Sequence, residues 1–324
     1  MTSRREFSAV LASASLLGLI SRPLMAQTPA VARIYVGFPA GGTADALSRR
    51  LADKLRGTYA PTVVVENKPG AGGQIAVTTL RDSAPDGSTL LVTPSSLISM
   101  NNYTFAKLPY KPLTDVTAVS LLCHFDHAFA VGPAVPASVK TLKDFLDWAK
   151  VSNAPGYGTP GSAGIPHLIG VLLSKRSGVA MTNIPYRGTA PTLQDLMGGQ
   201  VPAAVVPVGD YLPYMSTGKI RVLAVAGPKR SSFLPEVPTM RESSIDIEAR
   251  DWFGVFMPAR TPASVVARAS SDIQAALGDN ELRQSLIHIG MEPTPSTPAA
   301  LTAMAAREDG MWGRIIKEVG FVPE

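Results

Sequence analysis

The chain has 324 residues, of which 45% are hydrophobic and 17% are charged, and its formal net charge is +5. This length buries a large core and favours two lobes, and the composition excludes a long disordered block. The basic residues are scattered, without an aromatic-interleaved stripe, which excludes nucleic acid as a partner. Cys123 is the only cysteine, so stability must come from packing and not from an internal disulfide.

The first 26 residues are predicted to be a signal peptide. Residues 3–7 contain two adjacent arginines, an apolar stretch covers 9–20, and 23–26 resembles a cleavage site. The S-R-R-x-F start is typical of a twin-arginine signal, and an ordinary secretory leader is the alternative. Either signal predicts export to the periplasm with cleavage near Ala26, which lowers the net charge from +5 to +3. The sequence has no later run of about 20 apolar residues, so no membrane span is predicted.

Strand-like and helical segments then alternate along the chain. Short apolar runs predict strands at 34–38, 62–66, 89–93, 116–122, 129–131, 157–159, 182–185, 201–208, 220–225 and 247–256. Helical spacing of apolar residues predicts helices at 44–56, 73–83, 142–150, 165–177, 189–197, 263–277 and 298–319. This alternation predicts an α/β fold in which helices cover both faces of parallel sheets.

The chain is expected to cross between two Rossmann-like lobes near 126–131 and again near 250–256. The first lobe would then combine 27–126 with 255–324, and the second would comprise 127–254. Crossing strands of this kind act as a hinge, and a hinged cleft is a common way to enclose a ligand.

The turn after the first strand is the leading candidate for an anion site. A strand that joins a helix through glycines leaves backbone N–H groups unpaired, and the helix dipole adds positive potential there. The alternative is a tight β–α turn that Thr43 caps. The candidate ligand contacts are Phe38, Ala40, Gly41, Gly42, Thr43 and Asp45. Asp45 would repel a carboxylate, so it either holds the loop or receives a hydroxyl, an ammonium group or water.

A second glycine-rich loop follows the strand at 157–159, in the other lobe. Its candidate ligand contacts are Thr159, Ser162, Ala163, Gly164 and His167. Two anion-binding loops that face each other across a cleft would suit a ligand with a carboxylate at each end.

Two more strand ends carry candidate contacts. The hydroxyls at the end of 89–93 belong to Thr93, Ser95 and Ser96, and ligands sit at such carboxyl ends in open α/β sheets. Helix capping is the alternative role for these side chains. Tyr186, Arg187 and Gly188 follow another strand, and the guanidinium suits a bidentate carboxylate contact, with a surface ion pair as the alternative.

Spacing argues against three other kinds of site. The turn at 68–73 lacks the G-x-G-x-x-G spacing of a dinucleotide site and is interpreted as a structural turn. Pro160 stands where a G-x-S-x-G nucleophile elbow needs glycine, which disfavours a hydrolase. In a strand His124 and Asp126 would face away from His127, so no metal site is expected, and no cofactor either. Residues 252–253 either line the cleft or pack the hinge.

Several motifs stand in a fixed order over about residues 31–324: F-P-A-G-G-T-x-D, V-V-x-E-N-K-P-G-A-G-G, A-P-D-G-S-T-L-L, K-L-P-Y, I-P-Y-R-G, L-x-G-G-Q-V, K-R-S, L-P-E-V-P-T and W-F-G-V-F-x-P. Together they resemble the Bug (TctC-like) substrate-binding receptors of tripartite tricarboxylate transporters. The resemblance implies a two-lobe periplasmic binding protein fold that closes on a small organic acid without catalysis. It also implies that loops 38–45 and 159–167 grip carboxylates through backbone N–H groups and ordered water, with Thr93, Ser95, Ser96 and 186–188 beside the same cleft.

Two departures from the family pattern bear on the ligand. The loop that usually reads S-A-G-N-G-T-S-Q-H reads T-P-G-S-A-G-I-P-H at 159–167, and Val206 stands where an aspartate is usual. The loss of a carboxylate that could receive an ammonium group argues against an amino acid. An aromatic or aliphatic mono- or dicarboxylate is favoured.

The sequence therefore predicts a monomeric, non-catalytic receptor for a small organic carboxylate. The resemblance implies that the loaded receptor delivers its ligand to a large and a small membrane subunit. Two alternatives stay open: an exported α/β hydrolase that uses Ser162 and His167, and a ligand sensor for a membrane signalling protein.

Overall fold

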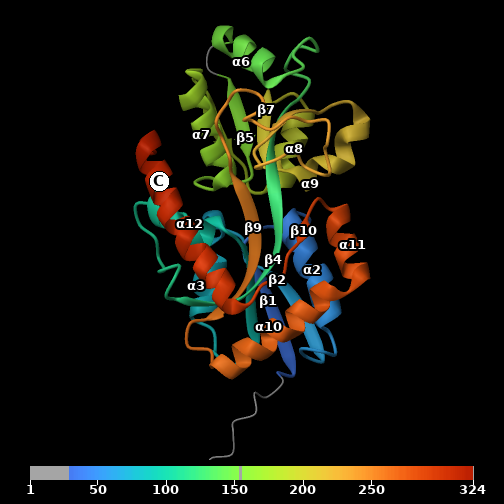
Figure 1. Ribbon diagram of the computed structural model, residues 1–324, viewed down its shortest axis with the longest axis vertical. Coiled ribbons are helices and arrows are strands. Elements are labelled where there is room, and N and C mark those ends of the chain that lie inside the picture. Colours follow the sequence, from blue (N-terminus) through green and yellow to red (C-terminus); the bar gives the residue numbers. More distant parts are fainter. Residues whose placement is uncertain (1–28, 153–154, 324) are drawn as a thin grey trace, which may run out of the picture.

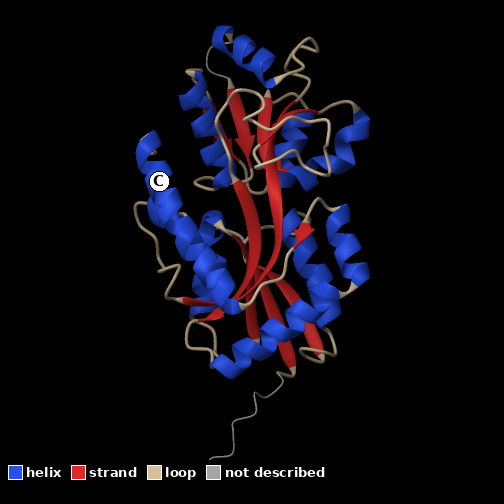
Figure 2. Ribbon diagram, viewed as in Figure 1, coloured by secondary structure: helices blue, strands red, loops and turns tan. Residues whose placement is uncertain are grey.

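The computed structural model describes residues 29–152 and 155–323. The predicted signal peptide, 1–26, therefore lies outside the described residues. The molecule is elongated, and two α/β lobes are connected by long strands that run between them (Figures 1 and 2). We refer to them as the β1 lobe, at the bottom of Figure 1, and the β5 lobe, at the top. No helix in the described part of the chain combines the length and the apolar character that a membrane crossing requires.

The strands are β1 (Val31–Val36), β2 (Thr62–Asn67), β3 (Thr89–Pro94), β4 (Val116–Val131), β5 (Gly156–Thr159), β6 (Thr182–Pro185), β7 (Ala203–Pro207), β8 (Arg221–Val225), β9 (Arg250–Pro258) and β10 (Glu292–Pro293). The helices are α2 (Thr43–Leu55), α3 (Gln74–Arg81), α4 (Ser96–Ser99), α5 (Asn101–Thr104), α6 (Leu142–Val151), α7 (Ile165–Ser177), α8 (Thr189–Met197), α9 (Val208–Tyr211), α10 (Ala263–Gly278), α11 (Asn280–His288) and α12 (Pro298–Val319). Two 3₁₀ turns, η1 (Ala71–Gly73) and η2 (Leu212–Thr217), complete the set.

The strands pair in the order β2-β1-β3-β9-β4-β7-β5-β6, with β8 and β10 also paired to β4. Pairing is parallel between β1 and its neighbours β2 and β3, and between β5 and its neighbours β6 and β7, whereas β3 is antiparallel to β9. The long strand β4 is antiparallel to β9 along its first part and to β7 and β8 along its end. The predicted α/β fold with two lobes is confirmed, and β4 links the two sheets.

The predicted break between strands at 116–122 and 129–131 is wrong, because β4 is one strand of 16 residues. Polar residues interrupt the apolar pattern at 124–127, yet 124–126 pair with β9, where Asp126 lies opposite Arg250, and His127 pairs with Pro207 of β7. Register shifts at 118–120 and 121–123 let the strand bend along its length. The residue boundaries proposed for the lobes stay a prediction.

The helix α11 was not predicted from the sequence. It begins two residues after α10 ends, because Asp279 caps it by accepting a hydrogen bond from the Leu282 N–H at 2.9 Å. Its neighbours match the predicted helices closely: α10 and α12 begin at the expected residues, 263 and 298.

The last helix, α12, joins the two lobes along one side of the molecule (Figure 1). Leu301 and Ala305 pack into a core around β3 and β9, whereas Trp312 and Ile316 pack into the core of the β5 lobe. The amphipathic spacing predicted for this helix therefore buries one face against both lobes.

Candidate functional site

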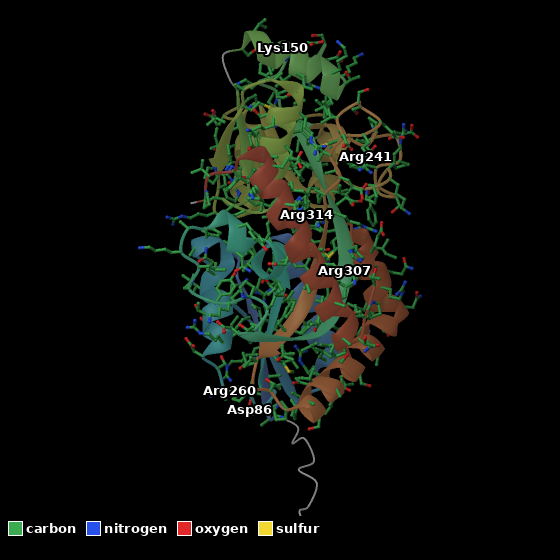
Figure 3. The ribbon with its side chains drawn as sticks, turned by 60° about the vertical axis from the view of Figure 1, so that its left-hand side comes forward. Asp86, Lys150, Arg241, Arg260, Arg307 and Arg314 are labelled. Atoms are coloured by element: carbon green, nitrogen blue, oxygen red, sulfur yellow. The ribbon has the colours of Figure 1, made fainter. Side chains whose placement is uncertain are left out.

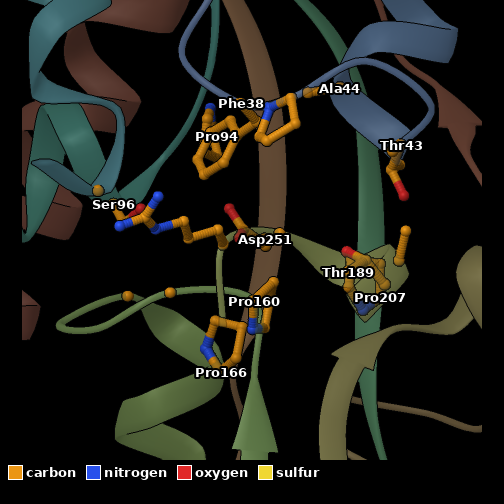
Figure 4. A pocket seen from close by; sticks show the side chains of 18 of the residues that line it. Phe38, Thr43, Ala44, Pro94, Ser96, Pro160, Pro166, Thr189, Pro207 and Asp251 are labelled. Atoms are coloured by element: carbon orange, nitrogen blue, oxygen red, sulfur yellow. The ribbon is translucent and has the colours of Figure 1, made fainter. Parts of the chain in front are cut away.

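A cleft opens between the lobes at the ends of several strands. Its walls come from the turns after β1, β3, β5 and β6 and from the strands that run between the lobes (Figure 4). The lining residues are Phe38, Pro39, Ala40, Gly42, Thr43, Ala44, Gly72, Pro94, Ser96, Asn101, Phe125, His127, Pro160, Gly161, Ser162, Gly164, Pro166, Arg187, Gly188, Thr189, Ala190, Pro191, Pro207, Asp251 and Phe253. The cavity measures about 120 Å³, and one water needs roughly 10–15 Å³, so a small organic molecule fits.

Three helices begin at this cleft, and none of them has a side-chain cap. Gly42, Gly164 and Gly188 are the N-cap residues of α2, α7 and α8, and among the residues that the structure describes none of these starts has a side-chain cap hydrogen bond. The cap residues and residues of the first turns line the cavity. Free backbone N–H groups and three helix dipoles therefore add positive potential to the same small space.

Backbone and side-chain hydrogen bonds shape the loop after β5. Ala163 has a φ of +56°, and its N–H donates to His167 Nδ1 at 3.1 Å. The N–H of Gly188 donates to the carbonyl of Pro160 at 3.0 Å, which links this loop to the turn after β6. His167 therefore supports the conformation of the loop through this hydrogen bond and does not itself line the cavity.

Asp45 holds the turn after β1. Its carboxylate accepts hydrogen bonds from the Gly41 N–H at 3.0 Å, from Arg49 at 2.9 Å and from Asn67 at 3.0 Å. Burial alone would raise the pKa of Asp45, but these hydrogen bonds together hold it below the ordinary value. Of the two roles considered for Asp45, holding the loop is the one that these contacts support.

Arg187 brings a positive side chain to the cleft. It is exposed and lines the cavity beside Gly188. Within the described residues no carboxylate is paired with Arg187, so its guanidinium is available to a ligand. A planar guanidinium binds a carboxylate in a bidentate manner.

The side of the cleft formed by β4 and β9 combines two aromatic rings with one buried polar pair. The rings of Phe125 and Phe253 stack with centroids 4.7 Å apart. Beside them His127 Nε2 and Asp251 Oδ2 lie 3.0 Å apart, and both residues are at most 3% exposed. In Figure 4 Asp251 lies behind the open centre, between Ser96 and Pro207.

A further hydrogen bond crosses from one lobe to the other. The Thr43 hydroxyl, at the start of α2, donates to Asp210 Oδ1 of α9 at 2.5 Å. Burial raises the pKa of Asp210, and the hydrogen bond from Thr43 opposes that rise. Close by, a Cβ on Gly209 would come within 1.9 Å of the Ile289 carbonyl oxygen, so only glycine allows this approach of α9 to the end of α11.

Half of the residues predicted to bind ligand line the cavity. They are Phe38, Ala40, Gly42, Thr43, Ser96, Ser162, Gly164, Arg187 and Gly188. The others do not line it: Gly41, Asp45, Thr93, Ser95, Thr159, Ala163, His167, Tyr186 and Val206.

Internal contacts account for several of the residues that do not line the cavity. Thr159 is buried and its hydroxyl bonds to Asn183 at 2.8 Å, whereas the Tyr186 hydroxyl donates to Asp195 at 2.8 Å. Val206 is fully buried among apolar side chains.

Sequence reasoning missed several residues of the cleft wall, three of which matter for its chemistry. His127 and Asp251 were not considered as ligand contacts, and Gly72 belongs to a turn that was interpreted as purely structural. A signal existed for the first two, since each is a polar residue in a buried strand that is rich in apolar residues. Within the described residues, no group of three or more His, Cys, Asp or Glu side chains is arranged to hold a metal ion.

A family model described as "Tripartite tricarboxylate transporter family receptor" (TctC) matches residues 47–321. The chain belongs to the TctC family. It is 31% identical to the protein BugT of Bordetella pertussis over 310 residues, which cover 93% of each chain. The members of this family are periplasmic solute-binding proteins, and the resemblance inferred from the sequence motifs is confirmed.

Solved structures show the same fold. The periplasmic binding protein BugD has a TM-score of 0.84 at 30% identity, and the match covers 90% of this chain and 98% of BugD. MatC from Rhodopseudomonas palustris with bound malate has a TM-score of 0.82 at 27% identity, with 88% and 98% covered. An R. palustris protein with adipate has a TM-score of 0.85 at 28% identity, with 91% and 98% covered. The TctC chain described here therefore has the periplasmic binding protein fold.

Proposed function

We propose that this TctC-family chain binds a small organic carboxylate in the periplasm and delivers it to the membrane subunits of a tripartite tricarboxylate transporter. The observation that carries the proposal is the convergence of three uncapped helix N-termini and Arg187 on one cleft. Malate and adipate, the ligands of two similar receptors, are both carboxylates, which supports the same ligand class here.

The expected binding energy is sufficient without metal. A hydrogen bond to a charged group contributes about 1.5–3 kcal/mol, and four of them would give about 6–12 kcal/mol before binding costs. Micromolar affinity needs about 8 kcal/mol. The stacked rings of Phe125 and Phe253 and the prolines of the lining favour a ligand with an apolar body between its polar groups.

The contacts of the two histidines near the cleft favour binding over catalysis. A nucleophilic serine must lie within hydrogen-bond reach of its base. His167 Nδ1 already accepts the Ala163 N–H, and His127 Nδ1 has no hydroxyl partner among the described residues. We therefore propose a receptor without catalytic activity. Ester hydrolysis that is abolished by Ser162→Ala would overturn this part of the proposal.

Gly42 offers a direct test of the binding loop. It has an ordinary φ of −88°, and a Cβ there would meet only the Pro39 carbonyl oxygen, at 4.0 Å. Gly42→Leu should therefore fold normally while its side chain occupies the cavity. In a screen of organic acids, an acid that raises the melting temperature of the wild type and contracts it in solution scattering should have neither effect on this variant.

A matched control is Gly278→Leu, because a Cβ at Gly278 would meet nothing within 4 Å and this glycine ends α10 outside the cleft. This variant should respond to ligand as the wild type does. An unchanged ligand response in Gly42→Leu would overturn the assignment of the loop.

Delivery, location and oligomeric state are separate parts of the proposal. Uptake of the ligand by proteoliposomes that contain the large and small membrane subunits should require this receptor. The mature chain should be recovered from the periplasm with its N-terminus near residue 27, and it should be monomeric by light scattering. Uptake that proceeds equally without the receptor would point to the sensing role instead.

A further inference from the structure

The buried pair His127 and Asp251 has a fixed hydrogen-bond arrangement. Asp251 Oδ1 accepts the N–H groups of Trp252 at 2.7 Å and Ser95 at 3.3 Å, and its Oδ2 faces His127 Nε2 at 3.0 Å. Backbone donors on one oxygen favour the acceptor-only carboxylate form of Asp251. Nε2 of His127 must then carry the proton that is shared with Asp251.

The other ring nitrogen of His127 has no protein partner. Nδ1 is buried and makes no hydrogen bond within the described residues, and His127 is only 2% exposed. A buried polar atom without a partner is unfavourable, so such an atom beside a cavity favours a ligand that can bond to it. His127 lines the same cavity as the start of α2 and Arg187.

The chemistry of an imidazole nitrogen selects the ligand group. A hydroxyl both donates and accepts, so it bonds to Nδ1 of neutral imidazole and to the Nδ1–H of imidazolium. A carboxylate only accepts and would also lie near the Asp251 carboxylate, whereas an ammonium group only donates. A hydroxyl is therefore the group that satisfies Nδ1 in either protonation state.

We propose that His127 is a specificity-determining ligand contact, oriented by Asp251, that selects carboxylic acids carrying a hydroxyl group. This inference rests on the proposed function, because the loops at the starts of α2, α7 and α8 must hold the carboxylate. The hydroxyl then lies against β4, beside the stacked rings of Phe125 and Phe253.

Matched acids that differ by one hydroxyl test the proposal. The pairs are malate and succinate, mandelate and phenylacetate, and 4-hydroxybenzoate and benzoate, each measured by isothermal titration calorimetry. In the pair that fits the cavity, the wild type should bind the hydroxy acid about 3- to 10-fold more tightly, as expected for one hydrogen bond. His127→Leu should reduce this ratio to about one.

His124→Leu is the matched control. His124 lies on the same strand, its Nδ1 is also buried without a partner in the described part of the chain, and it does not line the cavity. It should keep the wild-type ratio. A ratio of one in the wild type, or an unchanged ratio in His127→Leu, would overturn the role of His127 while leaving carboxylate binding intact. If no acid of either kind bound, both the proposed function and this inference would fail.

A spectroscopic measurement keeps the test independent of variant folding. The chain has four histidines, so ¹⁵N spectra of labelled wild-type protein can be assigned with His127→Leu, or with His127→Gln if the leucine variant does not fold. The Nδ1 resonance of His127 should move with the hydroxy acid and not with its deoxy partner. Equal shifts with both acids would contradict a direct hydroxyl contact.

Discussion

Glu308, on α12, should make the stability of the protein depend on pH. Its Oε2 accepts the Trp252 indole N–H at 2.8 Å and the Ser99 hydroxyl at 3.4 Å. Burial raises the pKa of Glu308 from 4.5 to about 7, the hydrogen bond from Trp252 opposes the rise, and the charge of Asp251 adds to it. A pKa difference of one corresponds to about 1.36 kcal/mol, so the raised pKa of Glu308 corresponds to about 3 kcal/mol in the free energy of unfolding.

The sign follows from the raised pKa. The folded protein binds this proton more tightly than the unfolded chain, so the stabilising contribution is complete below pH 4.5 and is lost as the pH rises through about 7. The free energy of unfolding should therefore fall by about 2–3 kcal/mol through this one group between pH 5 and pH 8.

Urea unfolding of the wild type and Glu308→Gln at several pH values measures this effect. Glutamine keeps an acceptor for Trp252 but does not ionise. The free energy of unfolding of the variant should therefore increase relative to that of the wild type as the pH rises. Glu318→Gln, an exposed position on the same helix, is the control and should follow the wild type. Identical pH profiles for the wild type and Glu308→Gln would refute the reasoning.

Two further variants test the cleft. Arg187→Met should weaken carboxylate binding about 10- to 100-fold in calorimetry, because it removes a charged hydrogen-bond donor, while the melting temperature without ligand stays unchanged. Arg260→Met, at the far end of the β1 lobe (Figure 3), should leave the affinity unchanged, and equal affinities for all three proteins would exclude Arg187 as a contact. Thr43→Val removes the hydrogen bond to Asp210 and should lower the free energy of unfolding by about 1–3 kcal/mol in urea, whereas Thr43→Ser should restore most of it. A Thr43→Val variant as stable as the wild type would show that this bond contributes little.

The fold was largely predictable because apolar periodicity is a local property. The strands β2, β3 and β5 and the helices α2, α7 and α8 lie where short apolar runs and helical spacing place them, whereas β1 begins three residues earlier than expected. The continuity of β4 was not predictable in this way. Its residues 124–127 look like a polar break in the sequence, and only pairing with β9 and β7 makes them part of a strand.

The site, like the fold, has parts that follow from local sequence patterns and parts that depend on pairing between distant segments. The loops that begin α2 and α7 were identified because a strand, glycines and a helix are consecutive in the chain. His127 and Asp251 are 124 residues apart, and the pairing of β4 with β9 brings them together. A single sequence carries no local pattern for such a pair, and the only signal is a polar residue in a buried strand.

In the proposed receptor, the loops at the helix starts and the strands β4 and β9 have different roles in ligand recognition. Backbone N–H groups at helix starts bind any carboxylate of suitable size, because they present the same donors whatever the side chains are. The strands β4 and β9 contribute side chains, and replacing His127 changes the hydrogen bonding of the wall without moving the loops. Affinity for the anion and selectivity for the body of the ligand can therefore vary independently. The loop motifs are therefore shared by the family, and under the proposal made for His127 the residues on β4 and β9 would select which acid is bound.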